Sequence, residues 1–255
     1  MKAKSLLLKL SKRFPKRYAK TNHDFVGLMA GSLPIDIHKI LLCLDFDEEV
    51  LPIAKEFKPD LIITHHPFIY GPKSKILKYD IYKKALYDEV VNSGLTIYSM
   101  HTNFDTGKGG MNDALSEALG LKDVYIPEKD IMMRIGYLDE PMEVEAFAKM
   151  AKEKLNADYG LLIAKGNKTV KKVAIVGGGG SRGYVVAKDE GADIYISGDA
   201  PHHVRREIVA REYNYLDLPH EIEKIFMPQM KKLLLEMDDS LEILIVDHEK
   251  LPKVI

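Results

Sequence analysis

Apolar and polar residues follow one another along the chain in an order that alternates strand-like with helix-like segments. Short apolar runs such as 39–46 are typical of strands covered on both faces of a sheet, and the segments between them space their apolar residues as helices do. The pattern predicts strands within 39–46, 60–67, 95–105, 171–180, 192–203, 215–223 and 241–247, helices within 1–14, 48–57, 81–94, 111–120, 181–191, 204–214 and 228–237, and a strand, a proline turn and a helix within 134–156. This alternation predicts an α/β fold.

The second half of the chain repeats the order of the first half. The same 20-residue spacing separates Ile40 from Asp60 and Val173 from Asp193. The segments KPDLIITHH and GADIYISGD then align without a gap, and the first half carries extra residues afterwards, mainly 68–80. A shared period with polar residues at the same strand ends predicts an internal duplication, with repeats 1–125 and 126–255 packed against each other.

Composition narrows the class of protein. The chain has 255 residues, 46% of them hydrophobic, and carries 37 Lys and Arg against 38 Asp and Glu. It can bury a core, and its net charge of −1 gives no reason to expect a nucleic acid or an acidic membrane as partner. The one cysteine, Cys43, excludes an internal disulfide framework and favours a reducing, cytoplasmic location. The longest apolar runs are far shorter than the roughly 18 residues of a membrane-spanning helix.

Histidine is distributed unusually. Six of the nine histidines stand in short clusters at predicted strand ends, accompanied by carboxylates: His65, His66, His101 with Asp105, Asp199 with His202 and His203, and His220 with Glu223. Functional sites of parallel α/β sheets form beyond the carboxyl ends of the strands. Because imidazole and carboxylate groups are ligands of zinc, iron and manganese, the clusters predict a metal site.

The spacing within two clusters constrains how their side chains can point. In an extended strand, the adjacent His65 and His66 would point to opposite sides. Either two neighbouring metals or a kinked loop fixed by Pro67 would let both contribute. His220 and Glu223 are three residues apart at a predicted helix start, which places both side chains on one face.

A glycine-rich segment after the strand 171–176 allows three interpretations. Gly178, Gly180 and Gly183 match the spacing of a dinucleotide-binding fingerprint, and Asp199 ends the following strand. The equivalent segment of the first half has no glycine, and a dinucleotide site would leave the histidines unexplained. We therefore favour a tight turn with positive φ and close packing, then a cradle for an anionic group, and last a dinucleotide site.

These residues lie in motifs that resemble the NIF-three-like family, also called the GTP cyclohydrolase I type 2 homologues. The motifs are HDFVGLMAG (23–31), ITHHPF (63–68), HTNFD (101–105), GMNDALSEALG (110–120), ISGDAPHH (196–203) and the pair His220 and Glu223. They follow the order of the family over nearly the whole chain.

The resemblance implies two intertwined, internally duplicated α/β repeats with mixed sheets, a dinuclear metal site in the cleft between them, and a ring-shaped homohexamer. Carried over position by position, the ligands of two divalent metals (zinc, iron or manganese) are His65, His66 and Asp105 of the first repeat and His220 and Glu223 of the second. Asp105 would be the bridging carboxylate. Asp199, His202 and His203 are assigned to substrate binding or to supporting the ligands.

One position departs from the pattern of the family. Many members place the final glutamate four residues after the last histidine, where this chain has Lys224. Charged lysine cannot bind a metal, so Glu223 is the better candidate and Glu221 a remote substitute.

We therefore expect a cytoplasmic, metal-dependent hydrolase in which metals activate a water molecule. His101 is the expected catalytic residue that donates or accepts the proton, since an unperturbed imidazole titrates near neutral pH. The family name suggests a purine nucleotide, GTP, or a related small phosphorylated substrate. The alternative is a non-catalytic metal-binding hexameric scaffold or regulatory interaction protein. A nucleotide-binding Rossmann protein is the third and least favoured interpretation.

Overall fold

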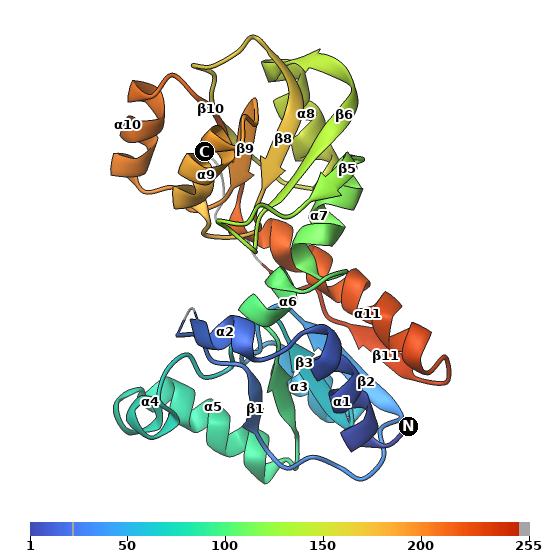
Figure 1. Cartoon of the computed structure of the whole chain (residues 1–255). Helices are drawn as coiled ribbons and strands as arrows, with labels where there is room; N and C mark the ends of the chain where they lie inside the picture. Colours follow the sequence, from blue (N-terminus) through green and yellow to red (C-terminus); the bar gives the residue numbers. More distant parts are fainter. Residues whose placement is uncertain (22, 250–255) are drawn as a thin grey trace. The chain divides into compact units, whose positions relative to one another are not determined.

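The chain folds into two compact units, each built on one mixed β-sheet (Figure 1). The computed structural model describes residues 1–21 and 23–249. The first unit comprises Met1–Gly110 and the C-terminal segment that begins at Phe226, and the second comprises Met111–Ile225. The predicted α/β class, with mixed sheets, is confirmed.

The first unit has a five-stranded sheet of order β1-β4-β3-β2-β11, in which only β1 is antiparallel to its neighbour. Its strands are β1 (Gly27–Ala30), β2 (Lys39–Cys43), β3 (Leu61–Thr64), β4 (Ile97–Ser99) and β11 (Glu242–Ile245). Its helices are α1 (Ala3–Arg13), α2 (Arg17–Thr21), α3 (Val50–Phe57), α4 (Lys73–Tyr79), α5 (Ile81–Asn92), α6 (Thr102–Thr106) and α11 (Phe226–Met237). Strands β3 and β4 are buried at every position, as their apolar runs predict.

The register of the central strands aligns the loops that follow them. Cys43 on β2 pairs with Thr64 on β3, and Thr64 pairs with Ser99 on β4. The hydroxyl groups of Thr64 and Ser99 lie 2.7 Å apart in a hydrogen bond. The three strands therefore end at one level of the sheet. Burial, together with the neighbouring carboxylate of Asp45, raises the pKa of the Cys43 thiol well above its usual value, as expected of an unreactive core cysteine.

The second unit has a six-stranded sheet of order β5-β6-β8-β9-β10-β7. Its strands are β5 (Lys122–Tyr125), β6 (Arg134–Glu143), β7 (Leu161–Ile163), β8 (Thr169–Ile175), β9 (Ile194–Ser197) and β10 (Asn214–Asp217). Its helices are α7 (Met111–Leu119), α8 (Val144–Lys154), α9 (Tyr184–Asp189) and α10 (His202–Ala210), with 3₁₀-helices η1 (Ser181–Gly183) and η2 (His220–Ile225). Strands β8, β9 and β10 are parallel, and the buried Tyr184, Tyr195 and Tyr215 belong to the core that α9 and α10 cover.

Several elements differ from the prediction, and strands β1, β5 and β7 and helix α2 were not predicted at all. Helix α4 occupies part of the insertion 68–80, where no helix was expected, and α6 forms where a loop was expected after β4. Strand β6 continues through Pro141 instead of turning there. The pairing of β6 with β8 is interrupted between Tyr137 and Met142, and such an irregularity accommodates a proline, which lacks the N–H that a regular ladder requires.

The two compact units do not coincide with the predicted repeats 1–125 and 126–255. Helix α7 and strand β5 belong to the second unit, whereas α11 and β11 return to the first. The backbone thus passes from the first unit into the second and back again. The internal duplication stays a prediction, and residues 250–255 of the second predicted repeat lie outside the described residues.

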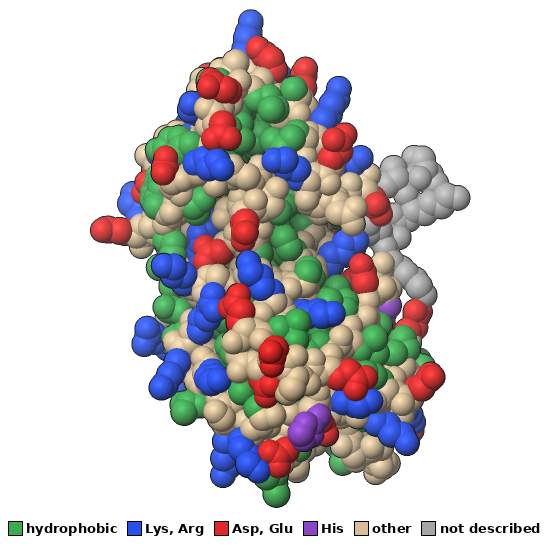
Figure 2. Space-filling view, turned by 90° about the vertical axis from the view of Figure 1, so that its right-hand side faces the viewer, with side chains coloured by type: hydrophobic (Ala, Val, Ile, Leu, Met, Phe, Trp, Pro, Cys, Tyr) green, Lys and Arg blue, Asp and Glu red, His purple; other side chains and the backbone are tan. Residues whose placement is uncertain are grey.

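Basic and acidic side chains are interspersed over the face shown in Figure 2. None of the helices within 1–21 and 23–249 combines the length and the apolar character that crossing a bilayer requires.

Arg134, the first residue of β6, connects the sheet of the second unit to helix α7. Its side chain is only 1% exposed. The guanidinium group donates through Nε to the carboxylate of Asp113 on α7 and through Nη1 to the carbonyl oxygens of residues 131–133, at 3.1 to 3.2 Å. Such a fork of donors is specific to arginine.

We expect Arg134→Ala to lower the free energy of unfolding by about 3 kcal/mol, because it removes the partner of a carboxylate and of several backbone carbonyls at once. The exposed ion pair between Lys129 and Asp189 provides the control, and Lys129→Ala should cost about 0–1 kcal/mol. Urea unfolding of both variants measures the difference. Equal losses would contradict the role assigned to Arg134.

Candidate metal centre

Three histidines of the first unit converge at the carboxyl ends of two adjacent strands. His65 and His66 form a bend directly after β3, and His101 follows β4. Each can offer a ring nitrogen such that the three nitrogens lie within 4.8 Å of one another. The ring centroids of His65 lie 5.1 Å from those of His66 and His101. The structure therefore brings together three of the histidines that the sequence singled out.

The orientation of His65 follows from the register of β3 and β4. Since Thr64 pairs with Ser99, the next residues, His65 and Met100, are also neighbours. His65 Nδ1 lies 2.9 Å from the carbonyl oxygen of Met100. A carbonyl oxygen only accepts, so Nδ1 carries the proton. Nε2 is then the nitrogen with a lone pair, and it lies 3.5 Å from Oδ1 of the buried Asp105.

His66 is oriented by the neighbouring strand on the other side. Cys43 pairs with Thr64, so Asp45 and His66 both stand two residues beyond the paired positions. His66 Nδ1 lies 2.6 Å from Asp45 Oδ2. The hydroxyl group of Thr64 donates to the carbonyl oxygen of His66 at 2.8 Å and closes the bend. The structure has a bend at His65 and His66, as the kinked-loop alternative predicts.

His101 is held by Asp24, which lies in the segment between α2 and β1. His101 Nδ1 lies 2.8 Å from Asp24 Oδ2, which also accepts a hydrogen bond of 2.8 Å from the hydroxyl group of Thr102. Burial acts to raise the pKa of Asp24, but the hydrogen bonds and the charge of His101 outweigh it, and the pKa is lowered. Asp24 therefore remains a carboxylate that accepts from His101.

The donor set of the first unit fits a transition metal. Each of the three imidazoles has Nδ1 bound to a backbone or carboxylate oxygen, which leaves Nε2 as the nitrogen with a lone pair. Metal-binding histidines characteristically donate their second ring N–H to such an oxygen, which fixes the tautomer and the ring orientation. Imidazole nitrogens with a nearby carboxylate are typical ligands of zinc and of other first-row metals.

The second unit builds a similar pair from the segment after β10. His220 Nδ1 is bound to Asp199 Oδ2, and His220 Nε2 lies 3.0 Å from Glu223 Oε2. The two residues lie in η2, and in a 3₁₀-helix side chains at i and i+3 eclipse each other. The expectation that this spacing places His220 and Glu223 on one face is confirmed. Lys224, one residue further, is not aligned with His220 in this geometry.

The glycine-rich segment packs tightly against this pair. Gly178 has a φ of +63°, and a Cβ at this position would lie 2.1 Å from Glu223 Oε1 and 3.2 Å from His220 Cε1. At the other end of the segment, the hydroxyl group of Tyr195 donates to the carbonyl oxygen of Gly180 at 2.7 Å. The favoured interpretation, a tight turn with positive φ and close packing, is confirmed at Gly178.

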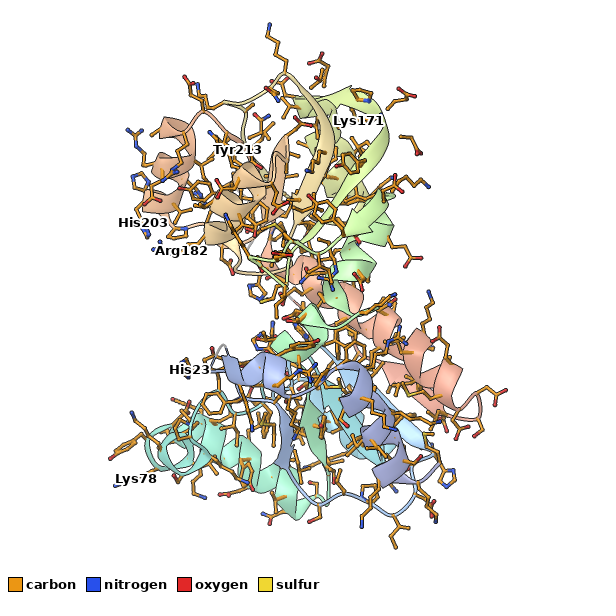
Figure 3. The ribbon with its side chains drawn as sticks, in the orientation of Figure 1. His23, Lys78, Lys171, Arg182, His203 and Tyr213 are labelled. Atoms are coloured by element: carbon orange, nitrogen blue, oxygen red, sulfur yellow. The ribbon has the colours of Figure 1, made fainter. Side chains whose placement is uncertain are left out.

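The remaining predicted polar residues are placed differently. Asp199 adopts a φ of +55°, an unusual conformation for a non-glycine residue, and binds His220. His202 and His203 are exposed at the start of α10. Figure 3 shows His203 beside Arg182, whose Nη2 lies 3.1 Å from His203 Nε2. Neither His202 nor His203 contacts His220 or Glu223 among the described residues.

Two residues that support the histidines were not assigned a role from the sequence. Asp24 lies within the motif HDFVGLMAG, and Asp45 lies near the carboxyl end of the predicted strand 39–46. The available signal for Asp45 was its position at the end of β2, level with the histidines. Asp24 is 77 positions from His101 in the sequence, so only the fold reveals that they are partners.

The sequence profile of the Duf34/NIF3 (NGG1p interacting factor 3) family matches residues 1–252 of the chain. The chain belongs to this family. Among its relatives is the GTP cyclohydrolase 1 type 2 homolog of Clostridium perfringens, which is 32% identical over 241 residues, covering 91% of this chain and 92% of the relative. The homolog of the same name from Lactococcus lactis is 30% identical, with 95% of each chain covered.

Solved structures share the fold of this Duf34/NIF3 member. The Staphylococcus aureus hypothetical protein SA1388 superimposes with a TM-score of 0.89, covering 100% of this chain and 99% of that one at 23% identity. A Bacillus cereus protein related to NIF3 gives a TM-score of 0.87 at the same identity and coverage. At this level of identity the comparison establishes the fold.

The contact of Gly178 with the His220–Glu223 pair can be tested by comparing a substitution at Gly178 with the same substitution at the neighbouring Gly179. We expect Gly178→Ala to destabilise the second unit by about 2–4 kcal/mol, because it adds left-handed backbone strain to a steric overlap with Glu223. Gly179→Ala is the control, since its Cβ would meet Asp199 only at an ordinary 3.6 Å. Thermal and urea unfolding measure both variants. Similar stabilities for the two would show that Gly178 does not constrain the pair.

Proposed function

We propose that this Duf34/NIF3 member is a metal-dependent hydrolase that uses its strand-end histidines and carboxylates as metal ligands. The observation that carries the proposal is the convergence of His65, His66 and His101, each with Nδ1 bound to an oxygen. A structural role alone does not require three adjacent imidazoles to present the same nitrogen. An Nδ1 held by an oxygen is typical of metal-binding histidines, here His65 and His66, and it also orients a proton carrier, here His101.

The proposed ligands are those that the family resemblance assigned: His65, His66, Asp105, His220 and Glu223. The inclusion of His220 and Glu223 rests on that resemblance and on the donor chemistry of the pair, in which Nε2 of His220 faces a carboxylate. We propose that the site holds two divalent metal ions. Zinc, iron and manganese all suit a set of imidazoles and carboxylates.

Bound metal ions of this kind lower the pKa of a coordinated water and polarise the bond that it attacks. The protein itself supplies the proton carrier. Asp24 holds the Nδ1 proton of His101, so that His101 Nε2 exchanges a proton with the substrate or the leaving group. Because its pKa is lowered, the Asp24 carboxylate stays charged and stabilises the imidazolium that forms when His101 takes up a proton.

The proposed substrate is a purine nucleotide, with GTP as the first candidate, or a related small phosphorylated molecule. The name of the relatives from Clostridium perfringens and Lactococcus lactis supports this choice. Opening of the purine ring of GTP requires attack of water at C8 and subsequent deformylation, and a metal-activated water is suited to the first step. The homohexamer and the cytoplasmic location stay predictions.

The proposal predicts that metal content and turnover fall together. We expect His65→Ala combined with Asp105→Ala to lose most of the bound metal and to lower any turnover of GTP or phosphoesters by more than about a hundredfold. His38→Ala, at an exposed histidine outside the clusters, is the control and should match the wild type. Elemental analysis after supply of Mn, Fe or Zn, followed by one activity panel, measures both. Turnover that survives in the double variant would overturn the mechanism.

His101→Ala separates the proton carrier from the ligands. If His101 carries the proton, the variant should keep the metal content of the wild type, and its turnover should fall by about 10²–10⁴-fold. Loss of metal in this variant would instead make His101 a ligand. The alternative function, a metal-binding scaffold, predicts a different result for the wild type. The protein would bind metal, turn over no member of the panel and unfold when the metal is removed.

A further inference from the structure

The first unit contains a cavity beside the histidine cluster that the metal-binding proposal does not use. It measures about 340 Å³ and is lined by residues of α2, of β1 and of the segments that precede α2, β1 and α4. Small-molecule sites in proteins are commonly clefts of about 300–1,000 Å³. Its volume therefore suits a compact ligand.

The cavity combines apolar walls with positive charge. Its apolar lining includes Phe25, Leu28 and Met29, and three lysines, Lys16, Lys20 and Lys73, also line it. Asp24 is the one acidic group among the lining residues, and its carboxylate already accepts hydrogen bonds from His101 and Thr102. The combination is complementary to an apolar body that carries a negative charge.

The three lysines are engaged to different degrees. The Lys73 ammonium group donates to the hydroxyl group of Tyr87 at 2.5 Å, and the Lys16 ammonium group lies 5.5 Å from the ring centroid of Tyr98. Lys20 is exposed, and its ammonium group makes no hydrogen bond or ion pair within the part of the chain that the structure describes. Lys20 is therefore the cation most available to an anionic ligand.

Aromatic rings connect the cavity to the histidine cluster. Phe25, in the cavity wall, packs edge-on against Tyr70 with ring centroids 5.9 Å apart. Tyr70 in turn lies 6.5 Å from the ring of His101, also edge-on. Asp24 makes a second connection, since it lines the cavity and binds His101 Nδ1. The cavity is thus connected to His101 through Asp24, on the side of its Nδ1, and through Tyr70.

We propose that this cavity is the substrate-recognition pocket, which takes a flat apolar ring system bearing an anionic group such as phosphate. The proposal rests on the proposed function for the reaction, and it adds where the substrate binds and which side chains select it. The ring system packs on Phe25 and Met29, and Lys20 and Lys16 bind the anionic group.

The probe 8-anilinonaphthalene-1-sulfonate has this chemistry, and its fluorescence reports binding without any turnover. We expect it to bind the purified full-length protein, and Leu28→Asp to weaken binding by about tenfold or more, because the new carboxylate repels the anion. Leu28 is 46% exposed, so the substitution should leave the fold intact. Leu8→Asp is the matched control at a leucine that is 56% exposed on α1, and its affinity should stay within about twofold of the wild type.

A second pair of variants covers the case in which Leu28→Asp fails to fold. Lys20→Glu should weaken binding of the probe by about tenfold, whereas Lys12→Glu, on the exposed face of α1, should not. GTP should displace the probe at lower concentration than guanosine or tripolyphosphate, which carry only the ring system or only the charge. Unchanged affinity of the probe in both Leu28→Asp and Lys20→Glu would overturn the proposal.

These outcomes are distinguishable from failure of the proposed function. Weaker binding of the probe to Leu28→Asp and Lys20→Glu, together with displacement of the probe by GTP, supports the pocket even if no turnover is ever found. The opposite outcome is that the metal-loaded protein turns over a nucleotide that does not displace the probe, and that Leu28→Asp leaves the KM for this nucleotide unchanged. The cavity is then not the substrate pocket, and the hydrolase proposal stands without it.

Discussion

The candidate site depends on one recurring interaction, a hydrogen bond from histidine Nδ1 to an oxygen at the end of a strand or in an adjacent loop. His65 uses the carbonyl oxygen of Met100, while His66, His101 and His220 use the carboxylates of Asp45, Asp24 and Asp199. In each case the partner comes from a segment far away in the sequence. For His65, His66 and His101 the interaction selects one tautomer, and with it the nitrogen that each ring presents. Without the strand register that aligns donor and acceptor, the same histidines would be ordinary polar residues at loop positions.

The same constraint explains features of the structure that have no obvious purpose in the fold. Asp199 adopts an unusual positive φ, and this conformation is accompanied by its hydrogen bond to His220. Gly178 has no room for a side chain because Glu223 and His220 occupy that space. Strained or closely packed backbone of this kind is concentrated at functional sites, where the surroundings hold it in place. Both features therefore support the view that the positions of His220 and Glu223 are determined by more than packing.

Much of the fold and part of the site could be predicted from the sequence. Apolar runs located β2 and β3, and the strand-end rule located His65, His66 and His101, because both depend on residues that are close together along the chain. Helix α6 and the path of β6 through Pro141 were missed, since tertiary contacts override local preference there. Asp24 could not be paired with His101 from the sequence, because their contact spans 77 positions and depends on the position of the segment before β1. The division into units was also beyond the sequence, since a local pattern does not reveal that α11 returns to the first sheet.

The central claim is that His65, His66 and His101 carry their proton on Nδ1, which leaves Nε2 of His65 and His66 to bind a metal and Nε2 of His101 to exchange a proton. Two-bond ¹H–¹⁵N correlation spectra of the histidine rings test this most directly, because the two tautomers have distinct ¹⁵N shifts. The account predicts the Nδ1–H tautomer at these three histidines in the metal-free protein, and a shift at Nε2 of the ligands when zinc is added, with His38 unaffected. Nε2–H tautomers at these positions, or no response to zinc, would contradict it.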